Sequence, residues 1–166
     1  MSDIRICRDE ERAPIFAIIN AAAEAYRGVI PADCWHEPYM PRDELDREIT
    51  HGVIFWVYEA AGKLIGVMGL QRVRDVDLIR HAYVLPGWQR QGIGAALLKH
   101  IRRQSTRPLL VGTWAAAGWA IRFYEKHGFE LVPPARKTAL LETYWSIPGR
   151  QAAASAVLAD KLLDAP

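Results

Sequence analysis

The sequence predicts an α/β (α+β) fold with one mixed, mostly antiparallel sheet flanked by helices. Three consecutive strand-like segments occupy residues 53–86, and from residue 92 onward strands alternate with helices. The 166 residues suit one domain over residues 1–166, without an internal repeat or a low-complexity tract. We therefore expect about seven strands in a single sheet.

The chain begins with a predicted strand and two predicted helices. Residues 3–7 predict a strand because apolar and polar residues alternate. Asp9 is placed to begin a helix that continues to about Tyr26, since acidic residues follow it and isoleucines recur at helical spacing. The proline-containing segment 28–41 is expected to be a loop, and residues 42–51 are expected to form the second helix.

The remaining elements follow from periodicity and from the glycines and prolines that bound them. Strands are expected at residues 53–60, 64–73, 77–86, 108–114, 129–132 and 154–163. Helices are expected at residues 92–103, 118–127 and 134–145. The apolar cluster on helix 134–145 either packs against the core of its own domain or forms a contact in a homodimer.

Composition excludes several functional classes. The formal net charge of +2 and the lack of a long basic run argue against a nucleic-acid partner. No apolar run reaches membrane-spanning length and the charged N-terminus does not resemble a signal peptide, so no membrane partner is expected. Two distant cysteines, Cys7 and Cys34, indicate a reducing compartment, and we expect a cytoplasmic protein. Cys34 and His36 lack a second ligand pair, so no metal is expected.

A pair of glycines, Gly92 and Gly94, opens the predicted helix 92–103 in the segment QRQGIGAALL. The dinucleotide-binding pattern fails at Leu97 and the P-loop pattern fails at Ala95, where each motif needs a different residue. The free N–H groups of a helix N-terminus nevertheless suit an anion, and glycines allow its close approach. The alternative is that the glycines only form a tight strand-to-helix turn.

Two segments in this order carry a resemblance to a known family. The pattern QRQGIGA at 89–95, preceded by YVLP at 83–86, resembles the acyl-CoA site of the GNAT superfamily of N-acetyltransferases. The segment AIRFYEKHGFELV at 120–132 is similar to that superfamily's helix–tyrosine–glycine–strand segment. The resemblance covers roughly residues 3–163. It departs at Ala117, where the superfamily often has a cofactor-binding asparagine.

The resemblance implies acetyl-CoA as co-substrate and a sheet that splays apart after its fourth strand. The pantetheine arm is then expected to pair with the backbone near Val84, and the pyrophosphate to lie on the amides of Gln91 to Ala95. The implied cofactor-binding residues are Val84, Gln89, Arg90, Gln91, Gly92, Ile93, Gly94 and Ala95.

Acyl transfer to an amine needs an acid for the leaving thiolate and a donor for the oxyanion. Tyr124 matches the superfamily's general acid, and a phenol with a pKa of about 10 suits an alkyl thiolate. The alternative is that Tyr124 packs in the core beside Phe123. The backbone N–H near Val84 is the expected oxyanion donor.

The general base has several candidates. His81 titrates in a suitable range and lies on the strand leading to the site, although a buried structural role is equally consistent with the sequence. Strand alternation places Arg80 on the same face as Val84 and His81 on the opposite face, so at most one of them would face the substrate. Glu24, Asp77 or a chain of waters could serve as the base instead.

The acceptor is expected to be a small-molecule amine, amino-acid-like or aromatic, that receives the acetyl group directly in a ternary complex. The loop near residues 25–41 and the turn after strand 108–114 supply an aromatic wall with arginine. The candidate acceptor-binding residues are Tyr26, Arg27, Trp35, Arg80 and Trp114. Two alternatives remain open at this point: a protein N-terminal or lysine acetyltransferase, and a non-catalytic acyl-CoA-binding sensor or interaction module.

Overall fold

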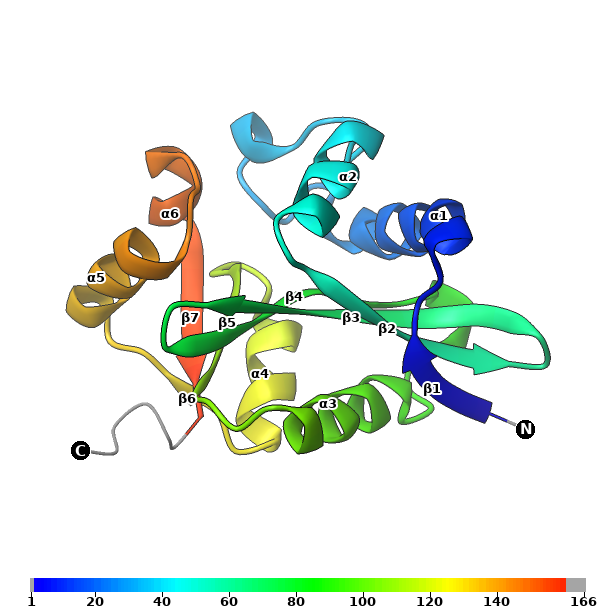
Figure 1. Ribbon diagram of the computed structural model, residues 1–166. Coiled ribbons are helices and arrows are strands. Elements are labelled where there is room, and N and C mark those ends of the chain that lie inside the picture. The colour runs from blue at the N-terminus through cyan, green and yellow to red at the C-terminus, as the bar shows by residue number, and fades with distance from the viewer. Residues whose placement is uncertain (1, 161–166) are drawn as a thin grey trace.

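The computed structural model describes residues 2–160, which contain one seven-stranded sheet (Figure 1). Its strands are β1 (Ser2–Ile6), β2 (Ile54–Ala60), β3 (Lys63–Val73), β4 (Val76–Val84), β5 (Leu109–Trp114), β6 (Glu130–Leu131) and β7 (Ser155–Ala159). Their order across the sheet is β1-β2-β3-β4-β5-β7-β6, and only β4 and β5 pair in parallel. The predicted fold class is confirmed. Residues 161–163 of the expected last strand lie outside the described residues.

Helices cover both faces of this sheet. They are α1 (Arg12–Ala23), α2 (Arg42–Thr50), α3 (Ile93–Gln104), α4 (Gly118–Lys126), α5 (Pro134–Tyr144) and α6 (Gly149–Ala153). Figure 1 shows α1 and α2 on one face, α3 and α4 on the opposite face, and α5 and α6 beside β7. Only the short α6 has no counterpart among the predicted helices. Helix α5 turns Leu141 into the core of its own chain.

The long helix predicted from Asp9 to Tyr26 is divided in the structure. A 3₁₀ turn over Asp9–Glu11 precedes α1, and a second 3₁₀ turn over Glu24–Tyr26 follows it. Asp9 does not cap the helix. The carboxylate of Glu11 instead accepts the backbone N–H of Arg8 at 2.7 Å.

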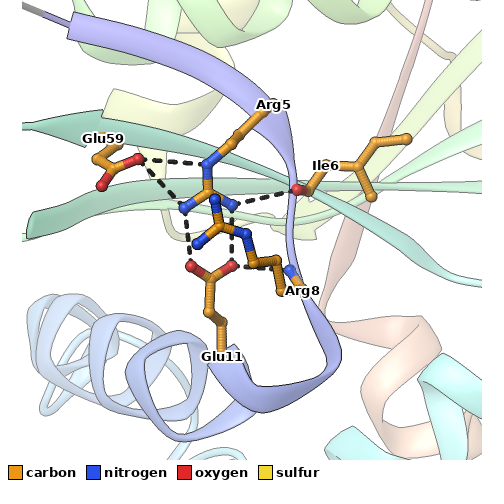
Figure 2. Close-up of polar contacts among 5 residues, drawn as sticks. All are labelled: Arg5, Ile6, Arg8, Glu11 and Glu59. Carbon is orange, nitrogen blue, oxygen red and sulfur yellow. Dashed lines mark hydrogen bonds and ion pairs between the residues drawn. The ribbon is translucent and has the colours of Figure 1, made fainter. Parts of the chain in front are cut away.

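Arg5 ties β1 to the start of α1 and to β2 (Figure 2). Its Nη1 and Nη2 donate to the two carboxylate oxygens of Glu11 at 2.9 and 2.7 Å, and its Nε donates to Glu59 at 3.2 Å. The hydrogen bonds from Arg5 lower the pKa of Glu11 to about 2. This ion pair fixes the entry of α1, whose far end leads into the turn that carries Tyr26.

Two apolar layers hold the helices against the sheet. On one face, Ile15, Ile18 and Ile19 of α1 are buried against β2 and β3. On the other face, Leu97 and Leu98 of α3 are buried with residues from β3, β4 and β5. Each fully buried side chain of this size contributes about 1.5–3 kcal/mol to stability, so the helix termini near the sheet are firmly positioned.

The sheet opens between β4 and β5. These strands pair only from Asp77 with Leu109 to Ile79 with Val111, although β4 continues to Val84 and β5 continues to Trp114. The C-terminal half of β4 therefore faces a gap, and β5 continues alongside β7 instead. The splay that the resemblance implies after the fourth strand is present.

A β-bulge lies within β4 beside this gap. Val67 of β3 pairs with Tyr83, whereas Gly69 pairs with Arg80, so β4 carries one extra residue between these two pairs. His81 occupies the bulge with a φ of 54°. Gly69 permits the close approach, because a Cβ at this position would lie 2.7 Å from the carbonyl oxygen of Arg80.

Candidate active site

A cavity of about 790 Å³ lies between the open end of β4 and the N-termini of α3 and α4. It is large enough for much of a cofactor-sized ligand. All predicted cofactor-binding residues except Gln91 line it, namely Val84, Gln89, Arg90, Gly92, Ile93, Gly94 and Ala95. Tyr26 and Tyr124 line it as well.

The loop before α3 presents free backbone donors to this cavity. Arg90 and Gly92 adopt left-handed conformations with φ of 63° and 79°. Along the described chain, no acceptor is hydrogen-bonded to the N–H groups from Gln91 to Ala95, and the first helical bond runs from Ala96 to Gly92. These donors and the positive end of the α3 dipole form a site suited to a phosphate. Since Gly94 has no side chain, an anion can approach the backbone closely.

The end of β4 offers further polar groups. The N–H of Leu85 donates to the carbonyl of Ile65 on β3, so strand alternation directs the N–H of Val84 away from β3, toward the gap. The side-chain amide of Gln89 donates to the carbonyl of Val84 at 3.1 Å. The gap edge of β4 can thus pair with an extended polar chain as a neighbouring strand would.

Tyr124 is almost fully buried on α4 and lines the cavity. Its ring packs edge-on against Phe123 and Phe129, with centroids 5.0 and 5.5 Å away. Burial raises the pKa of Tyr124, and the nearby Tyr26 adds to this effect. The ring therefore packs in the core, as one interpretation of the sequence expects, and the residue also lines the cavity; its role as general acid stays a prediction.

A second cavity, about 120 Å³, lies in the gap between β4 and β5. Tyr26 and Tyr83 line both cavities and so form the wall that they share. The smaller cavity also contacts Trp114, Arg80 and His81. The structure thus places four of the sequence-predicted residues, Tyr26, Arg80, His81 and Trp114, around one small space.

Phenol hydroxyls cluster at the shared wall. The phenols of Tyr26, Tyr39 and Tyr83 lie close enough together for each to influence the pKa of another. The indole N–H of Trp114 donates to the Tyr39 hydroxyl at 2.7 Å. Burial raises the pKa of Tyr26, Tyr39 and Tyr83, so the phenols are protonated at neutral pH.

Glu48 of α2 joins Arg80 and His81. Nη2 of Arg80 donates to Oε1 of Glu48 at 2.7 Å, and Nε2 of His81 contacts the other carboxylate oxygen. Burial acts to raise the pKa of Glu48, but the hydrogen bond from His81 and the charge of Arg80 outweigh it, so the pKa lies below its usual value. Glu48 is therefore an ionised carboxylate, 15% exposed, held between the two basic side chains.

The alternation expected from the sequence is wrong at this point. The bulge at His81 breaks the period of two, so Arg80 and His81 reach the same carboxylate instead of opposite faces. Arg80 also shares a face with Tyr83, not with Val84, because its partner Gly69 lies on the same face of β3 as Val67. Sequence reasoning overlooked Glu48 entirely, since nothing in a polar helix marks one glutamate as the partner of a distant bulge.

Other candidate residues lie outside both cavities. Arg27 pairs with Glu24 and Glu37 and lies over the ring of Trp35, 4.7 Å from its centroid. Neither Arg27 nor Trp35 is among the cavity-lining residues of the described chain. Asp77 is buried at the far end of β4, where it accepts the Ser105 hydroxyl at 2.6 Å.

The alternative general bases, Glu24 and Asp77, lie away from both cavities. Glu24 is an exposed partner of Arg27 and Asp77 is a buried partner of Ser105, and neither residue lines a cavity. Of the sequence-predicted side-chain bases, His81 alone lines one.

Two further properties concern the part of the chain that the structure covers. Within residues 2–160, no group of three or more His, Cys, Asp or Glu side chains is arranged to hold a metal ion. No helix in this range combines the length and apolarity required to cross a lipid bilayer.

Comparisons with known proteins agree with this geometry. Residues 51–131 match the family described as acetyltransferase (GNAT) domain. The chain is 31% identical over 77 residues to peptidyl-lysine N-acetyltransferase YiaC of Escherichia coli K12, a match that covers 46% of this chain and spans about half the length of that relative.

Two solved structures share the fold over nearly their whole length. PaiA N-acetyltransferase of Thermoplasma acidophilum, in complex with coenzyme A, has a TM-score of 0.71 at 18% identity, with 97% of this chain and 99% of that chain covered. A GNAT-family acetyltransferase of Staphylococcus aureus Mu50 has a TM-score of 0.73 at 15% identity, with 98% and 99% covered. The matched domain agrees with the splayed sheet and the open helix N-terminus: residues 51–131 of this chain match a GNAT acetyltransferase domain, and the whole described chain shares the fold of solved acetyltransferases.

Proposed function

We propose that the protein transfers an acetyl group from acetyl-CoA to the primary amine of a small molecule, directly and within a ternary complex. The observation that carries this proposal is the pair of cavities that meet at Tyr26 and Tyr83. The larger cavity suits the acyl carrier and the smaller one suits the acceptor. An acyl group at the shared wall would be within reach of an amine on the other side.

The larger cavity fits coenzyme A by its chemistry. The free N–H groups from Gln91 to Ala95 suit the pyrophosphate, and the unpaired edge of β4 at Val84 suits the amide groups of the pantetheine arm. The complex of the Thermoplasma relative with coenzyme A supports this assignment. The acetyl thioester would then lie near Tyr124.

Each proton of the transfer has a candidate donor or acceptor. His81 takes a proton from the acceptor ammonium, and the free amine attacks the thioester carbonyl carbon. The N–H of Val84 stabilises the oxyanion of the tetrahedral intermediate. When the C–S bond breaks, the hydroxyl of Tyr124 gives its proton to the departing thiolate, and the proton that the nitrogen loses as it becomes an amide returns to the Tyr124 phenolate. The raised pKa of Tyr124 keeps this proton in place at neutral pH.

A second candidate function is acetylation of lysine side chains in proteins. The similarity to the peptidyl-lysine acetyltransferase YiaC favours it. The small volume of the acceptor cavity, about 120 Å³, favours a small acceptor or the tip of a side chain over a bulky group. A non-catalytic acyl-CoA sensor is the third possibility, and a protonated phenol at Tyr124 argues for catalysis instead.

Release of coenzyme A thiol, measured with acetyl-CoA, a panel of small amines and a lysine-containing peptide, tests the proposal. We expect small amines to be acetylated and double-reciprocal plots to intersect, as in a ternary-complex mechanism. Parallel plots would indicate a covalent acetyl-enzyme and contradict direct transfer. Binding of acetyl-CoA without acetylation of any acceptor would favour the sensor.

A further inference from the structure

Among the described residues that line the acceptor cavity, Arg80 is the one arginine or lysine, and its charge is paired with Glu48. We infer that the acceptor is a primary amine on an uncharged stem, without a carboxylate beside the amine. This inference rests on the proposed function and narrows it, because amino acids are then poor acceptors. It also departs from the amino-acid-like acceptor that an arginine near the site suggests from the sequence.

Arg80, the arginine that lines the cavity, is already engaged by two partners. Its Nη2 donates to Glu48 at 2.7 Å and its Nη1 donates to the side-chain carbonyl of Gln71 at 2.8 Å. Only 21% of the Arg80 side chain is exposed, so the guanidinium has little freedom to turn toward a ligand. A charged Glu48 next to it also cancels its charge.

The other basic residues near the cavity are occupied as well. Arg27 is paired with two carboxylates, and Arg150 of α6 makes a bidentate contact with Asp33 at 2.7 and 3.1 Å. Lys137 of α5 donates to the backbone carbonyl of Ser155 at 2.9 Å. Arg27, Arg150 and Lys137 are not among the residues that line the cavity in the described chain.

The groups that remain suit an amine. The phenol hydroxyls of Tyr26, Tyr39 and Tyr83 and the ring of Trp114 surround the space, and His81 lies at its edge. Aromatic rings attract an ammonium group through their faces, and hydroxyls accept its hydrogen bonds. A carboxylate in the same space would be buried without a counter-ion, which is strongly unfavourable.

The direct test compares acceptors that differ in one group. Phenylethylamine, phenylalaninamide and phenylalanine share the same ring and amine, and the last two have nearly equal size but differ in charge. Values of kcat/KM are compared as the pH-independent limits of full pH profiles, so that differences in amine pKa are separated from differences in recognition. We expect phenylethylamine and phenylalaninamide to exceed phenylalanine by at least about tenfold.

The Glu48→Gln variant tests the cause of this preference. Removing the carboxylate frees the charge of Arg80, so the ratio between phenylalaninamide and phenylalanine is expected to fall severalfold. Because both acceptors are measured on the same variant, a general loss of activity cancels in the ratio. Asp43→Asn is the matched control, since it removes a carboxylate from the same helix at an exposed pair with Arg47 and is expected to leave the ratio unchanged.

The other outcomes distinguish between the inference, its cause and the proposed function. Equal use of phenylalanine and phenylalaninamide by the unmodified protein would overturn the inference and leave the proposed function intact. A ratio that does not change in Glu48→Gln would overturn the assignment of the preference to the Arg80–Glu48 pair. Acetylation of a lysine peptide with no small amine used would overturn the proposed function, and the inference with it.

Discussion

Replacing Tyr124 by phenylalanine removes one hydroxyl and should separate catalysis from stability. The phenol is the only part of Tyr124 that the proposed mechanism uses, and a general acid contributes about 10²–10⁴-fold to a rate. We therefore expect kcat to fall by this factor, which corresponds to about 2.7–5.4 kcal/mol of transition-state stabilisation. The KM for acetyl-CoA should change little.

The same substitution should leave folding nearly unaffected. Only burial and the nearby Tyr26 act on the pKa of the Tyr124 phenol, without a hydrogen bond from any described residue, so the variant leaves no donor or acceptor without its partner. The ring contacts with Phe123 and Phe129 remain. The melting temperature should therefore stay within about 2 °C of the unmodified protein.

Single-turnover thiol release is the appropriate assay, because slow product release can hide a loss in the chemical step. Tyr58→Phe is the matched control, since Tyr58 lies on β2 and lines neither cavity. A Tyr124→Phe variant that retains more than about a third of the unmodified rate would refute the general-acid role. Because burial raises the pKa of Tyr124, the free energy of unfolding should also depend on pH. The contribution of the neutral phenol is fully present below about pH 10 and is lost as pH rises further.

Three further changes test separate parts of the structure. Gly94→Ala should weaken coenzyme A binding by about tenfold in calorimetry, because its methyl enters the phosphate site. Its thermal stability should be unchanged or higher, since the new Cβ would lie 3.5 Å from the Phe123 ring, an ordinary contact, and alanine favours helix over glycine by up to about 1 kcal/mol. The pKa of Glu11, lowered to about 2, predicts that unfolding free energy falls as pH drops from about 4.5 to 2, by about 1–2 kcal/mol after screening by solvent. Arg5→Met should abolish most of this pH dependence in denaturant titrations, and an unaltered slope would contradict the ion-pair argument. Glu48→Gln should lower kcat without changing the KM for acetyl-CoA, because Glu48 holds His81 but does not line the cofactor cavity. A change in that KM alone would instead indicate a distortion of β4.

The sequence was sufficient for most of the fold and for a set of predicted cofactor-binding residues that, apart from Gln91, line one cavity. Periodicity and the bounding glycines located the hairpin of β2 and β3, the helix α3 that follows the glycines, and helix α4, since these features depend on neighbouring residues. The phosphate-binding interpretation of Gly92 and Gly94 also rests on local geometry. Gly92 adopts a left-handed conformation, and Gly94 has no side chain that would obstruct an anion. Both properties can be anticipated from the residue type.

The acceptor side depends on contacts between distant residues and could not be predicted. The bulge at His81 adds one residue to β4, so residues before it lie on the face opposite to the one that alternation counted from the residues after it predicts. No local pattern in the sequence marks such an extra residue. The partnership of Glu48 with Arg80 crosses 32 positions in sequence and is set by how α2 packs on the sheet. Arg80, one of the predicted acceptor-binding residues, is for this reason paired with a carboxylate that the sequence did not indicate.

The divergence of β4 from β5 gives this sheet two edges in its interior, in addition to the outer edges at β1 and β6. Unpaired strand edges are templates for association with other chains and are the first part of a sheet to exchange amide hydrogens. A cofactor arm that pairs with β4 would occupy such an edge as an additional strand. Amide exchange near Val84 should then slow on binding of coenzyme A, and the protein should aggregate less readily with its cofactor than without it.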